Sequence, residues 1–254
     1  MASEHNYWFL VRQFAITDFK LRYNNSILGY FWSLLNPLLQ FGVLLLVFSI
    51  FIRFDVPHYN LYLLLGIVMW GFLVESTNNS MNSMLGKAPL IKKIYFPRQI
   101  VIIASNITSS ISFILNMFLF SLFFIFFKVQ LSFTVIFLPI YLILFFIFII
   151  GLSFLLSALY VRFRDISHLW GIFLQLSFWF TPIVYPITLV PEKYRFFFNF
   201  NPMYTVIHNL REILIYGRMP ELFSTVVLAI SSLALFFIGY FIFDEMSDKF
   251  AEYI

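Results

Sequence analysis

The sequence has 254 residues, of which 61% are hydrophobic, 22% aromatic and only 11% charged, with a net charge of +4 and a mean hydropathy of +0.90. This composition lies far outside that of soluble domains and predicts a protein that folds in a lipid bilayer. Continuous apolar stretches such as 138–150 argue against a transmembrane β-barrel, whose strands alternate in polarity. Because the chain has no cysteine, disulfides, thiolate metal sites and thiol nucleophiles are excluded.

The first segment, residues 7–23, is predicted to be an amphipathic helix lying in the membrane interface. Its apolar residues fall on one broad arc, with Arg12, Gln13, Thr17 and Lys20 opposite. A helix packed within a soluble part of the protein is the alternative interpretation. Residues 1–23 lack the basic start, short apolar core and cleavage site of a signal peptide, so we expect no cleavage.

Six apolar runs are long enough to cross the roughly 30 Å hydrocarbon core of a bilayer as helices. The predicted fold is therefore an all-α integral membrane protein that forms one transmembrane domain over residues 1–254. The predicted spans are 30–52, 61–84, 100–127, 133–160, 166–185 and 222–243.

Basic residues predict the orientation of these spans. With six crossings, both ends of the chain lie on one side, and that side carries ten of the 16 Lys and Arg residues. The positive-inside rule then places both termini in the cytoplasm.

Two charged segments face the cytoplasm in this topology. The loop 85–98 carries four of the 16 basic residues between Lys87 and Arg98 and is bounded by prolines, which is typical of a loop that meets a soluble partner. The second segment, with Arg162, Arg164 and Asp165, closes the fourth span. It is either a charged stop at the headgroups or a second contact with that partner.

The segment 186–220 contains apolar pieces that are too short to span, separated by prolines. We expect short helices near the outer leaflet or re-entering the membrane, where irregular backbone must be buried in protein or face water.

The chain is not expected to be an enzyme. It has no Gly-x-x-x-x-Gly-Lys-Ser/Thr loop for nucleotide phosphates, and its four histidines show no metal-ligand spacing, so no cofactor is expected in this chain. Glu75 is the one acid clearly inside a predicted span, which is too few for an ion-driven relay. No feature suggests nucleic-acid binding.

Polar residues surround the cytoplasmic half of the second predicted span. Glu75, Asn78, Asn79 and Asn82 are joined there by serines and by a polar row in the third span. Burying polar groups away from lipid allows two interpretations, a hydrated substrate path or hydrogen bonds between helices.

Aromatic residues also allow two interpretations. Most are expected to face lipid or to anchor span ends at the interface. Some can instead offer ring faces to the C–H faces of sugars, and the candidates for such a path are Phe31, Trp32, Trp70, Phe72, Trp179 and Tyr185.

Four segments in order resemble the permease subunits of type-2 ABC exporters for cell-surface polysaccharides. They are Arg22 to Pro37, Leu90 to Arg98, Arg162 to Asp165 with Phe180 to Pro186, and Asn201 to Met203. The resemblance covers nearly the whole chain, and the O-antigen and capsule export permeases are the most similar.

This resemblance implies a homodimer in the bacterial inner membrane, joined to two copies of an ABC ATP-binding subunit that binds ATP and Mg²⁺. The expected substrate is an undecaprenyl-linked polysaccharide such as O-antigen. The resemblance also implies that the loop after the second span contacts the ATPase and couples to it. Segment 162–165 is the candidate for a second contact with the same subunit. The coupling residues are Lys87, Leu90, Ile91, Lys92, Lys93, Phe96, Pro97 and Arg98.

Other functions stay open at this point. A permease of the same class can carry capsule, teichoic acid, a lipid or a drug. An intramembrane lipid-glycan transferase needs acid, base or metal-ligating residues grouped at one membrane face, and none are visible in the sequence. A non-transporting assembly subunit is the third alternative.

Overall fold

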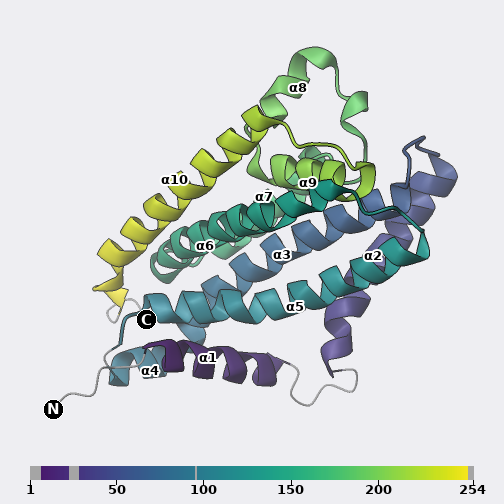
Figure 1. Cartoon of the computed structure of the whole chain (residues 1–254). Helices are drawn as coiled ribbons and strands as arrows, with labels where there is room; N and C mark the ends of the chain where they lie inside the picture. The colour runs from purple at the N-terminus through teal and green to yellow at the C-terminus, as the bar shows by residue number, and fades with distance from the viewer. Residues whose placement is uncertain (1–6, 23–28, 95, 251–254) are drawn as a thin grey trace.

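The computed structural model describes residues 7–22, 29–94 and 96–250, and every regular element in these ranges is helical. The predicted all-α class is therefore confirmed. The main helices, shown in Figure 1, are α1 (Tyr7–Arg22), α2 (Trp32–Leu45), α3 (Tyr59–Gly86), α4 (Ala88–Lys93), α5 (Gln99–Phe126), α6 (Leu138–Arg162), α7 (Ile166–Phe180), α8 (Glu192–Phe198), α9 (Pro202–Arg211) and α10 (Leu222–Ser247). Short 3-10 or π-helical pieces cover η1 (Gly29–Phe31), η2 (Leu46–Phe51), η3 (Phe133–Phe137), η4 (Ile187–Leu189) and η5 (Glu212–Tyr216).

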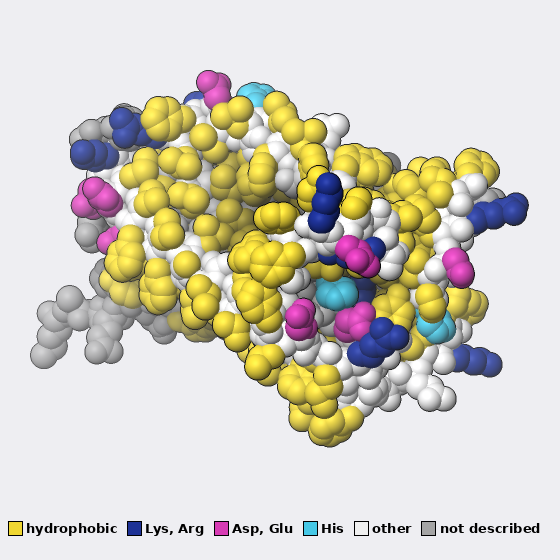
Figure 2. Space-filling view, turned by 90° about the horizontal axis from the view of Figure 1, so that it is seen from above, with side chains coloured by type: hydrophobic (Ala, Val, Ile, Leu, Met, Phe, Trp, Pro, Cys, Tyr) yellow, Lys and Arg dark blue, Asp and Glu magenta, His cyan; other side chains and the backbone are white. Residues whose placement is uncertain are grey.

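Five helical stretches of the described residues are long and apolar enough to cross a membrane. They begin and end within four residues of the predicted ranges, and they are Gly29–Ser49, Tyr59–Gly86, Gln99–Phe126, Phe133–Arg162 and Leu222–Ser247. Hydrophobic side chains cover much of the face seen in Figure 2, and charged side chains gather at its edges and in one group right of its centre.

The remaining predicted span, 166–185, is only partly helical. Its helix α7 has 15 residues, which cover about 22 Å at the usual rise of 1.5 Å per residue. The helix ends because Thr181 precedes Pro182, whose ring disfavours the helical conformation for the residue before it, and Thr181 is extended. Irregular backbone then continues to Pro186.

Buried amide and hydroxyl groups set the register of the central helices. Asn106 of α5 donates from Nδ2 to Ser80 Oγ of α3 at 3.0 Å, and Ser153 Oγ of α6 donates to Asn106 Oδ1 at 3.3 Å. The last turns of α3 and α6 thus lie at the same end as the start of α5. Because α4 follows α3 there, we call this end the α4 end and the other the α9 end.

Helices α6 and α10 pack against each other, and two glycines lie where their backbones come closest. A Cβ atom on Gly151 of α6 would lie 2.6 Å from Phe236 Cα of α10, and one on Gly239 would meet the carbonyl oxygen of Gly151. Small residues let membrane helices pack backbone to backbone, where van der Waals contact drives association. These glycines therefore define the crossing of α6 and α10.

Helix α1 lies along α5, and α4 lies beside it (Figure 1). Val11 and Ala15 are buried against α5, and Thr108 Oγ1 donates to the Ala15 carbonyl oxygen at 3.2 Å. Trp8 and Leu21 are about two-thirds exposed, with 68% and 64% of their surface accessible. The apolar arc of α1 is thus divided between a protein-facing side and an exposed side, which suits a helix at an interface.

The predicted short helices of segment 186–220 are present as η4, α8, α9 and η5. Their depth in the bilayer stays a prediction. Asn201 caps α9, and its Oδ1 accepts hydrogen bonds from the backbone N–H groups of Met203 and Tyr204 at 3.0 and 3.3 Å.

Arg211, the last residue of α9, is 2% exposed and fills a role that sequence analysis missed. Its guanidinium donates to the carbonyl oxygens of Pro182 at 2.8 Å, Ile183 at 2.7 Å and Tyr62 at 3.0 Å, and it lies 3.3 Å from the centre of the Tyr62 ring. Gly66 makes room for it, because a Cβ atom there would lie 2.8 Å from Arg211 Nη2. Arg211 therefore joins α9, the start of α3 and the irregular backbone after α7.

We predict that Arg211→Met lowers the stability of the folded protein severely. The change removes the donor to the Ile183 carbonyl oxygen and donors to the Pro182 and Tyr62 carbonyl oxygens, and an unsatisfied buried polar group costs about 1–3 kcal/mol. Arg211→Lys should lower the stability less, because an ammonium group still donates hydrogen bonds. It should not restore the full stability, because it lacks the planar guanidinium that reaches three carbonyl oxygens at once. Thermal unfolding of the detergent-purified chain measures the effect.

Arg218→Met is the matched control, since the Arg218 side chain is 73% exposed and pairs with Glu212 at 3.7 Å. An exposed pair of this kind is worth about 1 kcal/mol or less. Equal stability of the Arg211→Met and Arg218→Met proteins would contradict the role given to Arg211.

Candidate functional site

The polar row of α2 begins the site. Ser33, Asn36 and Gln40 recur at the spacing of one helix face within an apolar span. Pro37 lies inside α2 and has no N–H to donate to the carbonyl of Ser33, four residues earlier. Asn116 of α5 supplies the missing donor, from Nδ2 to the Ser33 carbonyl oxygen at 3.2 Å. The proline thus creates the need for a polar side chain on α5.

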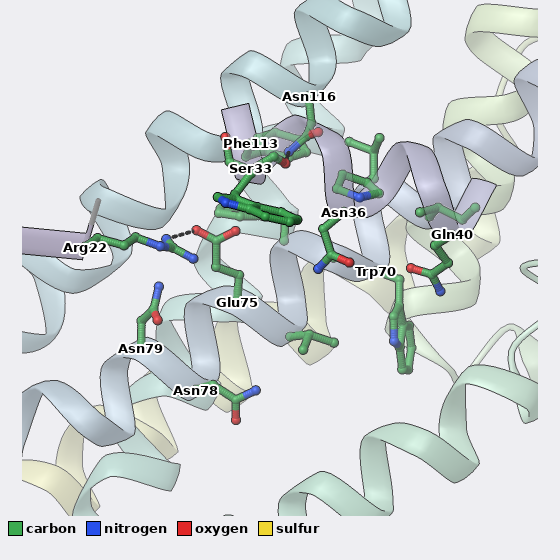
Figure 3. A pocket seen from close by; sticks show the side chains of 17 residues that line it. Arg22, Ser33, Asn36, Gln40, Trp70, Glu75, Asn78, Asn79, Phe113 and Asn116 are labelled. Atoms are coloured by element: carbon green, nitrogen blue, oxygen red, sulfur yellow. Dashed lines mark hydrogen bonds and ion pairs between the residues drawn. The ribbon is translucent and has the colours of Figure 1, made fainter. Parts of the chain in front are cut away.

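A cavity of about 720 Å³, which we call the upper cavity, lies between α2, α3 and α5. Figure 3 shows polar side chains around it from all three helices, and Arg22 from the end of α1. Its polar lining comprises Arg22, Ser33, Asn36, Gln40, Glu75, Asn78, Asn79 and Asn116. Such amides and hydroxyls donate and accept hydrogen bonds without a net charge.

Aromatic rings form the apolar part of the same wall. Trp32, Trp70, Phe72 and Phe113 line the upper cavity. Phe72 and Phe113 stack with their ring centres 4.4 Å apart, which fixes the orientation of both rings. The cavity therefore combines hydrogen-bonding groups with ring faces, which is the chemistry that a hydrated, weakly amphipathic ligand needs.

Glu75 has a partner that sequence analysis did not assign. Arg22, the last residue of α1, donates from Nη1 to Glu75 Oε1 (Figure 3), with the two side chains 31% and 21% exposed. A lone acid at mid-membrane costs about 2.5–3.5 kcal/mol on insertion scales. The ion pair and the hydrated cavity offset this cost, and they place the pair at the α1 edge of the upper cavity.

A second cavity of about 650 Å³, the lower cavity, lies under α1. It shares Arg22 and Asn79 with the upper cavity, so the two adjoin at the Arg22–Glu75 pair. Residues of α1, α3 and α5 line the lower cavity, together with Lys87 and Leu90 at α4. Lys87 Nζ donates to Asp18 Oδ2 at 2.6 Å and lies 5.4 Å from the centre of the Phe14 ring.

Helix α4 divides the residues of the predicted coupling loop into two groups. Pro89 sits in the first turn, where its missing N–H costs no hydrogen bond. Leu90, Lys92 and Lys93 are exposed, whereas Ile91 and Phe96 are 7% exposed. Phe96 packs edge-on against Phe14 of α1 at 5.7 Å. The loop is thus anchored to α1 and offers a leucine and two cations to the outside.

The remaining coupling candidates lie at the same end. Pro97 and Arg98 are half-buried before α5, and Arg162, Arg164 and Asp165 are exposed between α6 and α7. The guanidinium groups of Arg162 and Arg164 lie over the rings of Phe163 and Tyr160, at 5.1 and 5.7 Å.

The structure brings most of the path candidates together. Trp32, Trp70, Phe72, Glu75, Asn78 and Asn79 line the upper cavity, and Asn82 lines the lower one. Three candidates lie elsewhere: Phe31 is exposed in η1, Trp179 is exposed near the end of α7, and Tyr185 donates from its hydroxyl to the Trp179 carbonyl oxygen at 3.0 Å. The spacing of Ser33, Asn36 and Gln40 was the sequence signal that could have added α2 to the site.

Comparisons with known proteins agree with this architecture. The family described as ABC-2 type transporter matches residues 10–215. A protein of Klebsiella pneumoniae named O-antigen export system permease protein RfbA is 30% identical over 236 residues, which are 92% of this chain and 91% of that protein. A protein of the same name from Myxococcus xanthus is 26% identical over 93% of this chain and 92% of its own length. The match over most of the chain, on a bundle of long apolar helices, establishes that this protein belongs to the ABC-2 type transporter family of integral membrane permeases.

Proposed function

We propose that the chain is the transmembrane subunit of an ATP-driven exporter that moves undecaprenyl-linked O-antigen polysaccharide across the bacterial inner membrane. The observation that carries the proposal is the upper cavity, whose amides and ring faces suit a sugar chain. The names of the similar proteins, which align over about nine-tenths of both chains, support this choice of substrate.

A homodimer completes the passage in this proposal. Only 6% of the residues in the most apolar 18-residue stretch of the first span are buried in the single chain, although this span carries one polar wall of the upper cavity. Two copies that pair across this surface would turn two cavities toward a common passage and would shield their polar groups from lipid.

The proposed topology has six crossings with both termini in the cytoplasm. Trp170 Nε1 donates to Thr77 Oγ1 at 2.9 Å near one end of α7, and Tyr59 OH donates to the Val184 carbonyl oxygen at 2.8 Å beyond its other end. The chain from Trp170 to Val184 therefore runs beside the stretch of α3 between Thr77 and Tyr59. This stretch is about 27 Å long at 1.5 Å per residue, which approaches the hydrocarbon thickness. Helix α7 and the irregular backbone after it can thus cross together.

Energy comes from a separate subunit in this mechanism. The family implies an ABC ATP-binding partner, and we propose that two copies bind ATP and Mg²⁺ and dock on the α4 end. The exposed residues Leu90, Lys92 and Lys93, with the segment 162–165, form the docking surface. Closure of the ATP-binding subunits would push on this surface and change the shape of the path.

Co-expression with a candidate ABC ATP-binding subunit from the same genome tests the proposal. The purified complex should retain a lipid-linked polysaccharide that mass spectrometry identifies, and inverted vesicles should move that glycan only with ATP. If the complex instead retains a teichoic acid, a capsule precursor or another lipid, that molecule would replace O-antigen as the proposed substrate. Absence of transport by an intact complex would favour an assembly subunit, and turnover without any ATPase would favour a transferase.

We predict that the double change Lys92→Glu and Lys93→Glu weakens docking of the ATP-binding subunit at least about tenfold, because reversed charges place like charges across the interface. Co-purification from membranes measures docking, and membrane insertion should stay intact. Lys193→Glu, on α8 at the opposite end, is the control and should leave docking unchanged. Normal co-purification of the double variant would remove α4 from the docking surface.

We predict that Gly71→Trp blocks export by filling the upper cavity. Gly71 lines this cavity, and a Cβ atom there meets no atom within 4 Å, so a side chain can leave the backbone at this position toward the cavity. Ile230→Trp, at a position of α10 that is 64% exposed, adds the same side chain outside the cavity. Surface glycan should fall to background for Gly71→Trp alone. Equal export by the two variants would place the path elsewhere.

A further inference from the structure

Two charged side chains on one face of α1 attach this helix to two different positions along α3. Asp18 and Arg22 are four residues apart, which puts them on neighbouring turns of the same face. Asp18 pairs with Lys87 and Arg22 pairs with Glu75. Lys87 and Glu75 are twelve positions apart in the chain, so α1 bridges the end of α3 and its middle.

Lys87 sits at the joint between α3 and α4. It ends α3 and begins α4 with φ −102° and ψ 12°, outside the helical conformation of its neighbours. Its side chain is 11% exposed because Asp18 and the Phe14 ring cover it. Phe14 also contacts Phe96, beyond the other end of α4. A displacement of α4 against α3 therefore acts directly on α1.

The Arg22–Glu75 pair occupies the boundary between the two cavities. Arg22 lines both of them, Glu75 lines the upper one, and Asn79, one turn further along α3, again lines both. The pair therefore lies where the lower cavity at α4 meets the upper cavity between α2, α3 and α5.

The surroundings of the pair make it exchangeable. Side chains that are 31% and 21% exposed and that face cavities can regain hydration when they separate. A fully buried pair would leave an unpaired charge in a medium of low dielectric constant, and this would lock the contact. The pair can therefore hold one state of the protein without preventing the other.

We propose that α1 is an electrostatic relay that couples α4 to the boundary between the cavities. In the structure both ion pairs are made, and the relay assigns this arrangement to the closed state of the boundary. Movement of α4 shifts Lys87, α1 follows through Asp18, and Arg22 separates from Glu75, which opens the lower cavity into the upper one. The proposal deepens the proposed export function and rests on it for the source of the movement.

A single introduced cysteine tests the relay without any substrate. The sequence has no cysteine, and Gly71→Cys places a thiol in the upper cavity with open space around it. In inverted vesicles, a charged methanethiosulfonate reagent added outside reaches this thiol from the α4 end. The labelling rate therefore reports whether the boundary is open.

Charge reversal at the boundary gives the first comparison. In the Gly71→Cys background, Arg22→Glu and Glu75→Arg should each raise the labelling rate about fivefold or more, the lower range of allosteric coupling. The double reversal rebuilds an ion pair of opposite sense and should return the rate toward that of the parent. Arg12→Glu, on the exposed face of α1, is the matched control and should change nothing. Unchanged rates in both single reversals would overturn the relay.

The second comparison tests transmission from α4. With the ATP-binding subunit bound, a non-hydrolysable ATP analogue should raise labelling in the parent, and Asp18→Asn should remove this rise while preserving side-chain shape. The milder Arg22→Gln replaces Arg22→Glu if the reversal prevents folding. An analogue response that persists in Asp18→Asn would overturn the relay even if export is normal. Absence of glycan export by a complex of the unchanged chain would instead contradict the proposed function, and labelling of the Gly71→Cys protein would still decide on the relay.

Discussion

The need to satisfy every backbone polar group where water is scarce governs this structure. In a bilayer an unpaired carbonyl costs several kcal/mol, so each break in a helix must be answered by a side chain from another element. Two breaks dominate here. Pro37 leaves the Ser33 carbonyl oxygen without its helical donor, and the Asn116 side chain donates to it instead. The irregular backbone after α7 leaves several carbonyl oxygens without helical donors, and the side chains of Arg211 and two tyrosines donate to them.

The same constraint explains why the polar groups gather between α2, α3 and α5. A side chain that repairs a helix break must come from a neighbouring helix, and the repair brings further polar groups to that interface. Asn116 is needed at Ser33, and Asn36 and Gln40 continue the polar face of α2 beside it. Glu75 is tolerated there because Arg22 pairs with it and the cavity hydrates it. The polar contact between α2 and α5 beside the upper cavity is thus linked to the helical hydrogen bond that Pro37 removes.

Sequence reasoning reached the parts of the fold that depend on local composition. The all-α class and the limits of five spans follow from hydropathy alone, and the half of α3 nearer to α4 was marked by its amide residues. It missed features that depend on partners distant in the chain. Arg211 was not singled out, because a hydropathy window cannot show that its side chain donates to carbonyl oxygens near residue 182. Arg22 and Glu75 are 53 residues apart, and neither reveals the other. The length of α7 was overestimated because its apolar run continues past the point where Pro182 ends the helix.

The two arginine contacts differ in a way that separates a fixed end from a mobile one. Arg211 is 2% exposed and binds three carbonyl oxygens from two elements at once, so breaking its contacts would leave a buried guanidinium without acceptors. Arg22 faces a carboxylate across hydrated cavities, and both groups can be solvated separately. Work applied at α4 therefore meets little resistance at the Arg22–Glu75 pair and high resistance at Arg211. A helix bundle with this distribution of contacts opens at its α4 end while its α9 end keeps its shape. Opening at the α9 end then requires a second movement, in which the elements joined by Arg211 move together as one rigid unit.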